Sequence, residues 1–354
     1  MMRLSPLTKS ATLAAALSLG KFMRIVVYGA GSIGCYLGAS LHSAGLDSVL
    51  LGRERLQQVL EQHGAIELSD YQGAQQRVTD VPYHTDPKVL AQADIVLVTL
   101  KCLAMEDAAQ QLANYCRPAT RVVCLQNGLG SDLAVRQQCQ GLKILRGIVG
   151  FNVVGDGAHF HRATEGDVHM EHDPLLMPIQ HAWQRQGIAC ELNSEFDRIA
   201  WAKLQLNLNN VINALSDLPL KAQLEQRAYR RVLAMAMQEL VDVAQAKGIE
   251  LAQLTALPAT WLPKLMNVPD WLFKRLAKRM LAIDPEARSS MWEDIQHGRP
   301  TEILFLNGAV ASEGEQEGIA TPVNHALARL MWAVEQGKRP TGMSGPELLA
   351  AVTS

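Results

Sequence analysis

The chain has 354 residues, a formal net charge of −2 and 48% hydrophobic residues. At about 150 residues per domain, this length predicts two domains, each large enough to bury a core. The composition is too apolar for a disordered chain. A near-zero net charge gives no general attraction to nucleic acid or to an anionic membrane. We therefore expect no nucleic-acid partner and no membrane partner, with only local basic patches left open.

The first 22 residues combine Arg3 and Lys9 with a short apolar stretch, as in a weak signal peptide. The stretch is too short to span a membrane, and a strong strand pattern begins at Met23. We interpret residues 1–22 as an N-terminal extension or as the product of a translation start placed upstream of Met23, with secretion as the alternative. The six cysteines form no CxxC pair, which predicts free thiols and a cytoplasmic protein.

From Met23 to about Phe151, short apolar β-branched runs alternate with stretches of helical spacing. Such runs are typical of strands buried on both faces of a parallel sheet, and their alternation with helices predicts βαβ units. The predicted strands are RIVVYG, SVLLG, DIVLVTL, RVVCLQN and KILRGIVGF. Residues 152–173 then predict a β meander. After Ser194, the helical segments 196–215, 224–247, 271–283 and 302–314 follow.

Residues 29–34, Gly29-Ala30-Gly31-Ser32-Ile33-Gly34, follow the first predicted strand and begin a predicted helix. In that setting GxGxxG indicates dinucleotide binding. Gly29 allows the tight turn, Gly31 lets the backbone approach a pyrophosphate, and Gly34 allows the helix to pack on the strand. The helix N-terminus offers free N–H groups to the phosphates. We expect all six residues to bind the cofactor; a glycine-rich turn without a ligand is the alternative.

The second predicted strand ends in Gly52-Arg53-Glu54-Arg55. NAD sites usually carry Asp or Glu at this strand tip, where the carboxylate accepts from the ribose 2′-OH. Gly52 occupies that position here, and the guanidinium of Arg53 suits a 2′-phosphate. The pattern favours NADP over NAD. Glu54 argues for NAD, and Arg55 is a second candidate for the phosphate.

Lys101 follows the strand DIVLVTL, and Asn127 ends the run RVVCLQN. In an open α/β sheet the carboxyl ends of the strands border the ligand crevice. We therefore expect both residues to face the nicotinamide or the substrate. A surface lysine and a turn-forming asparagine before Gly128 are the alternatives.

The segment from Trp201 to Asn213 places four asparagines in an otherwise apolar helix pattern. Asparagine is unfavourable inside helices and costs free energy when buried without partners. At 100° per residue, Asn207 lies about 40° from Lys203, and Asn210 lies about 20° on the other side. These three residues form one polar stripe, which predicts a site for a small polar acid. A surface stripe with capping asparagines is the alternative.

Two further groups of residues call for an interpretation. Glu302 lies near a predicted helix start, where the helix dipole favours a carboxylate. Four histidines occur within residues 159–172, but no matching carboxylate or cysteine pattern accompanies them. We therefore predict no metal site.

The motifs GAGSIG, VTLK, QNG, WAKLQLN, RSSMWEDIQHGRPTEI and GIATPVN occur in this order between Met23 and about Ala333. With them the chain resembles the ketopantoate reductases (2-dehydropantoate 2-reductases). The resemblance implies an α/β fold, an N-terminal Rossmann-type doubly wound parallel sheet followed by an all-helical C-terminal domain. We expect an extension (1–22), an NADP-binding domain (23–185), a helical substrate and catalytic domain (186–340) and a C-terminal tail (341–354).

Carried over motif by motif, the resemblance assigns roles to particular residues. It implies that Lys203 and Glu302 are catalytic, with Lys203 as the general acid. Asn207 and Ser290 match substrate-binding positions. Asn127 matches an asparagine that contacts both cofactor and substrate, and Glu302 lies near both.

One position departs from the family pattern. The family's second asparagine is expected at position 211, which is Val211 here. Asn210 fits the helix face better, and Asn213 fits the following sequence better, so both stay candidates. Val153 matches a position that touches NADP through its backbone. Lys101 is expected to add positive potential near the carboxylate or the cofactor.

The implied reaction is the NADPH-dependent reduction of 2-dehydropantoate to pantoate, a step of pantothenate and coenzyme A biosynthesis. Lys203 donates a proton to the ketone oxygen as hydride reaches C2. The departure at Val211 leaves open a same-fold NADP-dependent reductase of another 2-oxo acid or an imine-type substrate. A cofactor-binding regulator is a third alternative, which the intact Lys203 and Glu302 disfavour. A small 2-oxo acid is the expected partner, and a homodimer is compatible with the sequence.

Overall fold

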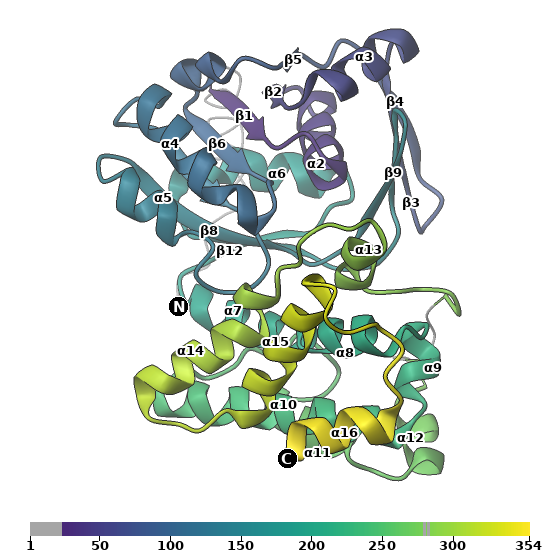
Figure 1. The fold of residues 1–354 in the computed structure, drawn as a ribbon. Coiled ribbons are helices and arrows are strands. Elements are labelled where there is room, and N and C mark those ends of the chain that lie inside the picture. The colour runs from purple at the N-terminus through teal and green to yellow at the C-terminus, as the bar shows by residue number, and fades with distance from the viewer. Residues whose placement is uncertain (1–22, 279–280, 282–283) are drawn as a thin grey trace, which may run out of the picture. The chain divides into compact units, whose positions relative to one another are not determined.

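The structure is a computed structural model that describes residues 23–278, 281 and 284–354 (Figure 1). The interpretation of residues 1–22 therefore lies outside the described residues. The chain divides into two compact units. The first comprises residues up to Gln126 together with Ser131–Phe196, and the second comprises Asn127–Gly130 and Asp197–Ser354. Among the described residues, no helix is both long enough and apolar enough to span a membrane.

A large sheet organises the first unit. Its strands are β1 (Arg24–Tyr28), β2 (Asp47–Leu51), β5 (Tyr83–His84), β6 (Ile95–Val98), β7 (Arg121–Cys124), β8 (Lys143–Val149), β11 (Val168–Glu171) and β12 (Cys190–Asn193). They lie in the order β12-β11-β8-β7-β6-β1-β2-β5, and all neighbours are parallel except β8 and β11. The chain winds outward from β1 in both directions, so β1 and β6 flank the point where ligands bind in doubly wound folds. The predicted Rossmann-type fold is confirmed.

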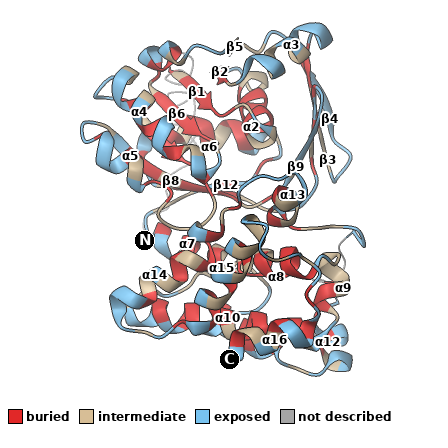
Figure 2. Ribbon diagram, in the orientation of Figure 1, coloured by how far each residue is buried: buried red, intermediate tan, exposed pale blue. Residues whose placement is uncertain are grey.

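Helices cover both faces of this sheet, and its central strands are coloured as buried in Figure 2. One layer contains α2 (Ser32–Ser43) and α6 (Met177–Arg185), and the other contains η1 (Pro87–Gln92), α4 (Met105–Tyr115) and α5 (Leu133–Gln138). Alternate strand residues enter opposite layers: Val27 packs in the first and Val26 in the second. Because both faces of the sheet pack against hydrophobic layers, the strands are apolar throughout, and this is why their sequences can be recognised as buried strands.

A smaller sheet of four strands completes the first unit. It consists of β4 (Gln75–Val78), β3 (Ile66–Asp70), β10 (His159–Arg162) and β9 (Val153–Asp156), in that order. The predicted meander over 152–173 is only partly right, because β9 and β10 pair here while β11 joins the large sheet. The parallel pairing of β10 with β3 joins segments far apart in sequence, so no local pattern signals it.

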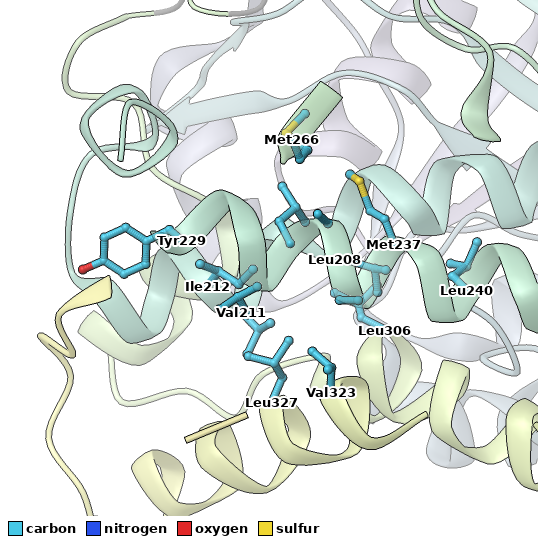
Figure 3. Packing of buried hydrophobic residues seen from close by; sticks show 14 of the residues in the cluster. Leu208, Val211, Ile212, Tyr229, Met237, Leu240, Met266, Leu306, Val323 and Leu327 are labelled. Carbon is cyan, nitrogen blue, oxygen red and sulfur yellow. The ribbon is translucent and has the colours of Figure 1, made fainter. Parts of the chain in front are cut away.

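The second unit is helical. Its helices are α7 (Phe196–Asn207), α8 (Asn209–Ser216), α9 (Leu220–Leu224), α10 (Arg227–Ala246), η4 (Ala259–Trp261), α11 (Leu262–Met266), α12 (Asp270–Leu276), α13 (Ser290–Gln296), η5 (Ile303–Phe305), α14 (Asn307–Glu317), α15 (Pro322–Glu335) and α16 (Gly345–Thr353). They share one hydrophobic core, in which Ile212, Met237 and Leu327 are buried (Figure 3). Helix α16 falls within the expected tail, and its Leu348 and Val352 are buried in this core.

Candidate active site

The glycine-rich segment, residues 29–34, connects β1 to α2, and β2 holds its backbone. Gly29 and Ala30 both donate their N–H groups to the carbonyl of Leu51, at 2.9 and 3.1 Å. Gly29 has a φ of +113°, a conformation that glycine adopts readily and other residues rarely do. A Cβ at Gly29 would also lie 2.7 Å from the backbone nitrogen of Leu100. This turn therefore requires glycine.

The surroundings of the other two glycines differ. A Cβ on Gly34 would overlap the Gly29 carbonyl oxygen and lie 2.6 Å from the hydroxyl of Thr99, so Gly34 serves helix packing. A Cβ on Gly31 would meet nothing within 4 Å. Gly31 is the N-cap residue of α2, and no side chain caps that helix. Uncapped amides beside open space suit a phosphate, so the residues present fit the predicted dinucleotide.

Arg53 lies beside this segment, at the end of β2. It is exposed and forms the N-cap of α3 (Glu54–His63) in an extended conformation. Arg55 is also exposed, whereas Gly52 is half-buried. The hydroxyl of Tyr83 donates to the carbonyl of Arg53 at 3.0 Å. Tyr83 belongs to no sequence motif, and it reaches this corner through the pairing of β5 with β2.

Lys101 and Val153, the remaining residues expected at the cofactor in the first unit, lie at loop and strand ends. Lys101 is exposed and is the N-cap of η2 (Cys102–Ala104), after β6. The Gln126 side chain donates to the carbonyls of Val98 and Leu100, at 2.9 and 3.0 Å, and so fixes the chain leaving β6. Val153 begins β9 and is half-buried.

Lys203 lies on α7 in the second unit and is half-buried between the buried residues Ala202 and Leu204. Burial lowers its pKa from the ordinary value of 10.5, because desolvation penalises the charged form. No ion pair involves Lys203 within the described residues. An amine whose pKa is lowered toward neutrality releases its proton more readily.

The asparagine-rich segment is two helices and not one. Helix α7 ends at Asn207 and α8 begins at Asn209, so the single predicted helix over 196–215 is wrong at Leu208. The break is local, since the Leu208 N–H still bonds to the Leu204 carbonyl at 3.1 Å. Angles computed for a continuous helix therefore do not fix where Asn210 lies relative to Lys203.

The four asparagines differ in what their side chains bind. The Asn209 amide exchanges two hydrogen bonds with Gln223, at 2.9 and 3.2 Å. Asn213 is fully buried; it donates to the Leu218 carbonyl at 2.8 Å and accepts from the Ser289 N–H at 2.9 Å. The side chains of Asn209 and Asn213 thus form hydrogen bonds that stabilise the fold. Asn207 and Asn210 are half-buried, and in the part of the chain that is described neither side chain forms a hydrogen bond.

Ser289 brings the start of α13 to α8. Its hydroxyl accepts from the Trp292 N–H at 3.2 Å, which caps α13, and donates to the Asn210 carbonyl at 3.2 Å. Ser290, the expected substrate residue, is the next residue and is exposed. The structure therefore brings Ser290 close to Asn210, because the neighbouring Ser289 bonds to Asn210. The sequence motif does not distinguish the roles of these two serines.

Asn127 and Glu302 belong to two segments of the second unit that touch. The Leu129 N–H donates to the Phe305 carbonyl at 3.0 Å. Gly128 has a φ of +83°, and a Cβ there would overlap the same carbonyl oxygen. Glu302 is half-buried and directly precedes η5, as expected for a carboxylate at a helix start. The requirement for glycine after Asn127 is therefore packing against the segment that carries Glu302.

A buried polar network holds the chain that follows Glu302. Asn307 is fully buried and donates to the Asn324 side chain at 2.9 Å. Asn324 donates in turn to the Glu239 carboxylate at 2.7 Å, and this carboxylate also accepts from the Val323 N–H at 2.8 Å. Burial raises the pKa of Glu239. Asn324, in the motif GIATPVN, thus stabilises the fold. In the sequence, only a polar residue within an apolar helix pattern indicates this network.

The four histidines of residues 159–172 do not gather around one point that could hold a metal ion. His159 and His161 both bond to the Ser69 hydroxyl, at 2.7 and 2.8 Å, within the small sheet. Over the described residues, no group of three His, Cys, Asp or Glu side chains is placed to hold a metal ion.

Each unit thus gathers part of the predicted site. The first carries the glycine-rich segment, Arg53 and Lys101 after the carboxyl ends of β1, β2 and β6, and Val153 at the start of β9 in the small sheet. The second carries one group around α7, α8 and α13, and Asn127 and Glu302 on two segments that meet at Phe305. A doubly wound sheet with an uncapped glycine-rich turn, joined in one chain to a helical unit with a half-buried lysine, is typical of a dinucleotide-binding oxidoreductase.

The family is established by two sequence models. "Ketopantoate reductase PanE/ApbA" matches residues 25–174, and "Ketopantoate reductase PanE/ApbA C terminal" matches residues 195–335. The chain belongs to the ketopantoate reductase family, which confirms the resemblance seen in the motifs. As a member of this family it is an oxidoreductase that uses a nicotinamide cofactor.

Curated relatives cover almost the whole chain. The 2-dehydropantoate 2-reductase of Halobacterium salinarum is 29% identical over 318 residues, 87% of this chain and 98% of the relative. That of Archaeoglobus fulgidus is 26% identical over 329 residues, 90% and 99% of the two chains.

Solved structures show the same fold at lower identity. A PanE/ApbA family ketopantoate reductase from Ralstonia eutropha has a TM-score of 0.75 at 24% identity, over 89% of this chain and 99% of that one. A D-mandelate dehydrogenase with NADH and anilino(oxo)acetate has a TM-score of 0.73 at 21% identity, with the same coverage. The fold is therefore shared by proteins with different substrates.

Proposed function

We propose that this chain reduces 2-dehydropantoate to pantoate with NADPH and that Lys203 supplies the proton, a step of pantothenate and coenzyme A biosynthesis. The observation that carries the proposal is the half-buried, low-pKa Lys203, followed one turn later by Asn207, in a chain of the ketopantoate reductase family. The relatives named as 2-dehydropantoate 2-reductases support the same substrate.

The cofactor's phosphates are assigned to the first unit. Residues 29–34 hold the pyrophosphate with the uncapped N-terminus of α2, and the open space at Gly31 lets the backbone approach it. Arg53 binds the 2′-phosphate by a charge-assisted hydrogen bond, which sets the preference for NADPH. Val153 contributes a backbone contact from the start of β9. The reduced nicotinamide, when bound, supplies the hydride for C2 of the substrate.

Lys203 acts on the ketone oxygen. As C2 is reduced, negative charge develops on this oxygen, and the Lys203 ammonium donates its proton there to give the hydroxyl of pantoate. Burial makes the ammonium more acidic, so the proton transfer needs less driving force. Before the transfer, the same positive charge stabilises the oxygen electrostatically.

The remaining polar residues hold and orient the substrate. Asn207, Asn210 and Ser290 offer amide and hydroxyl groups to its carboxylate and hydroxyl. Asn127 and Glu302, which lie on two segments joined by the hydrogen bond between Leu129 and Phe305, are assigned to bind substrate and cofactor. The Lys101 ammonium adds positive potential for the anionic substrate.

One observation favours a second candidate function, the reduction of another 2-oxo acid or an imine-type substrate. The family's second asparagine is Val211 here, and Val211 is fully buried in the core of the second unit. Its side chain therefore offers no substitute contact, and Asn210 has to supply it from the neighbouring position. A shifted amide changes which substrate group is recognised.

A steady-state assay with 2-dehydropantoate and NADPH tests the proposal. We expect kcat/KM above about 10⁴ M⁻¹s⁻¹, the lower end of the ordinary enzyme range. Parallel assays with other 2-oxo acids, with NADH, and with a cyclic imine serve as comparisons. A higher kcat/KM for one of the other substrates would replace the first function with the second.

A further inference from the structure

The corner where β2 ends is closed by Tyr83 and Ala30. Gly52 follows β2, and its N–H donates to the His84 carbonyl at 3.0 Å, next to Tyr83. A Cβ on Gly52 would overlap the Tyr83 hydroxyl oxygen and lie 2.6 Å from the Cβ of Ala30. Gly52 itself does not have a positive φ, so its backbone would accept any side chain. Only the neighbours Tyr83 and Ala30 exclude a side chain at Gly52.

The Tyr83 hydroxyl is held in this place by a hydrogen bond. It donates to the Arg53 carbonyl at 3.0 Å. The same carbonyl accepts from the N–H groups of Leu56 and Gln57, at 3.1 and 3.3 Å, which begin α3. Tyr83 thus anchors the residue that carries the guanidinium, at the N-cap of α3.

The excluded position has a chemical meaning. In NAD sites the residue at this strand tip is Asp or Glu, whose carboxylate accepts from the ribose 2′-OH and repels a 2′-phosphate. Tyr83 keeps that position without a side chain and at the same time fixes the backbone of Arg53. We propose that Tyr83 is a specificity-determining residue of the cofactor site, which excludes an acid at position 52 and positions Arg53 for the 2′-phosphate.

The ionisation of Tyr83 agrees with this role. Burial raises its pKa to about 12, so the hydroxyl keeps its proton at neutral pH. It therefore donates to Arg53 and adds no negative charge beside a phosphate. The proposal rests on the proposed preference for NADPH, and its two tests use binding and stability rather than turnover.

The first test measures binding of 2′,5′-ADP and of 5′-AMP to the full chain by calorimetry, with Tyr83→Phe against wild type. We expect the preference for 2′,5′-ADP to fall about three- to tenfold, the effect of one lost hydrogen bond. Affinity for 5′-AMP should stay unchanged. Tyr71→Phe is the matched control, since Tyr71 lies in the same unit and also carries a hydrogen-bonded hydroxyl.

An equal loss for both ligands, or no loss, would overturn the positioning role. A wild-type chain without any preference for 2′,5′-ADP would instead overturn the assignment of NADPH, which separates the two failures.

The second test needs no ligand. Gly52→Ala is made in the wild type and in Tyr83→Ala, and the melting temperatures are compared in a double-mutant cycle. Contact with Ala30 is common to both backgrounds, so the difference isolates Tyr83. We expect Gly52→Ala to lower the melting temperature by about 3 °C or more in the wild type, and by clearly less without the tyrosine ring. Equal shifts in the two backgrounds would show that Tyr83 does not exclude a side chain at position 52.

Discussion

The glycine-rich segment of the first unit and the α7–α8 segment of the second build their sites in opposite ways. Residues 29–34 work through the absence of side chains: packing requires glycine at Gly34, whereas at Gly31 the absent side chain leaves open space for a phosphate. The α7–α8 segment works through polar side chains, of which Asn209 and Asn213 hold the fold while Lys203 and Asn210 remain for chemistry. A site that binds through backbone N–H groups is therefore specified by positions that must lack a side chain. A site that binds through side chains is specified by the polar groups that form no hydrogen bonds within the fold.

The largest effect expected is for the lysine of α7. We expect Lys203→Ala to lower kcat about 10²- to 10⁴-fold, the usual contribution of a positioned general acid. The dissociation constant of NADPH should stay within about twofold. Steady-state rates and a fluorescence titration with NADPH measure the two quantities. Lys221→Ala, which removes a half-buried lysine of α9, is the matched control.

The pH dependence of the wild type sharpens the same test. Because the donor must be protonated, kcat should fall as pH rises through the pKa of Lys203. Burial lowers that pKa, so the fall should begin below the range where an ordinary lysine titrates, near 10.5. A rate that stays flat up to that range, or an equal loss of turnover and NADPH affinity in Lys203→Ala, would exclude Lys203 as the donor.

Two glycines of one motif should respond in contrasting ways. Gly34→Ala forces a Cβ onto the Gly29 carbonyl, and we expect it to cost about 3 kcal/mol of unfolding free energy, the upper range for overpacking. Gly31→Ala meets no protein atom within 4 Å, so its stability should stay within about 0.5 kcal/mol of wild type. Its NADPH affinity should nevertheless fall. Denaturant unfolding and NADPH titration of both variants provide the comparison; equal stabilities would contradict the packing role of Gly34.

Arg53 should affect one cofactor and not the other. We expect Arg53→Ala to raise KM for NADPH about thirtyfold, the effect of losing a hydrogen bond to a charged group. KM for NADH should hardly change, because NADH has no 2′-phosphate. Arg55→Ala is the informative comparison, since Arg55 is exposed at the same helix start. If discrimination persists in Arg53→Ala and is lost in Arg55→Ala, the phosphate is read by Arg55.

Sequence patterns sufficed where the determinants are local. The β1–turn–α2 segment and the five predicted strands follow from short apolar runs and three glycines, and the structure contains them all. Sequence patterns failed where the role of a residue depends on a partner from elsewhere in the chain. The role of Asn213 depends on Leu218 and Ser289, and that of Tyr83 on the pairing of β5 with β2. Helical spacing also cannot reveal the break at Leu208, since that residue keeps helical backbone angles.

The smallest effects expected separate the two asparagines that the sequence left as alternatives. Asn213→Ala leaves the part-buried Leu218 carbonyl and the buried Ser289 N–H without a partner, so we expect a loss of about 2 kcal/mol in unfolding free energy. Asn210→Ala should leave stability unchanged and raise KM for the substrate about fivefold, the effect of one neutral hydrogen bond. Denaturant unfolding and substrate titration of both variants measure this split.

Asn209→Ala is the control for this pair, because Asn209 lies on the same helix, α8, and its amide is hydrogen-bonded to Gln223 of α9, so that the change should affect stability alone. The reverse pattern, in which Asn210→Ala lowers stability and KM responds to Asn213→Ala, would mean that Asn213 gives up its two hydrogen bonds to bind substrate. Binding would then have to offset the cost of leaving two backbone groups inside the protein without hydrogen-bond partners, which one hydrogen bond to a small acid does not achieve. The committed contacts of Asn213 are therefore the physical reason to place the substrate at Asn210.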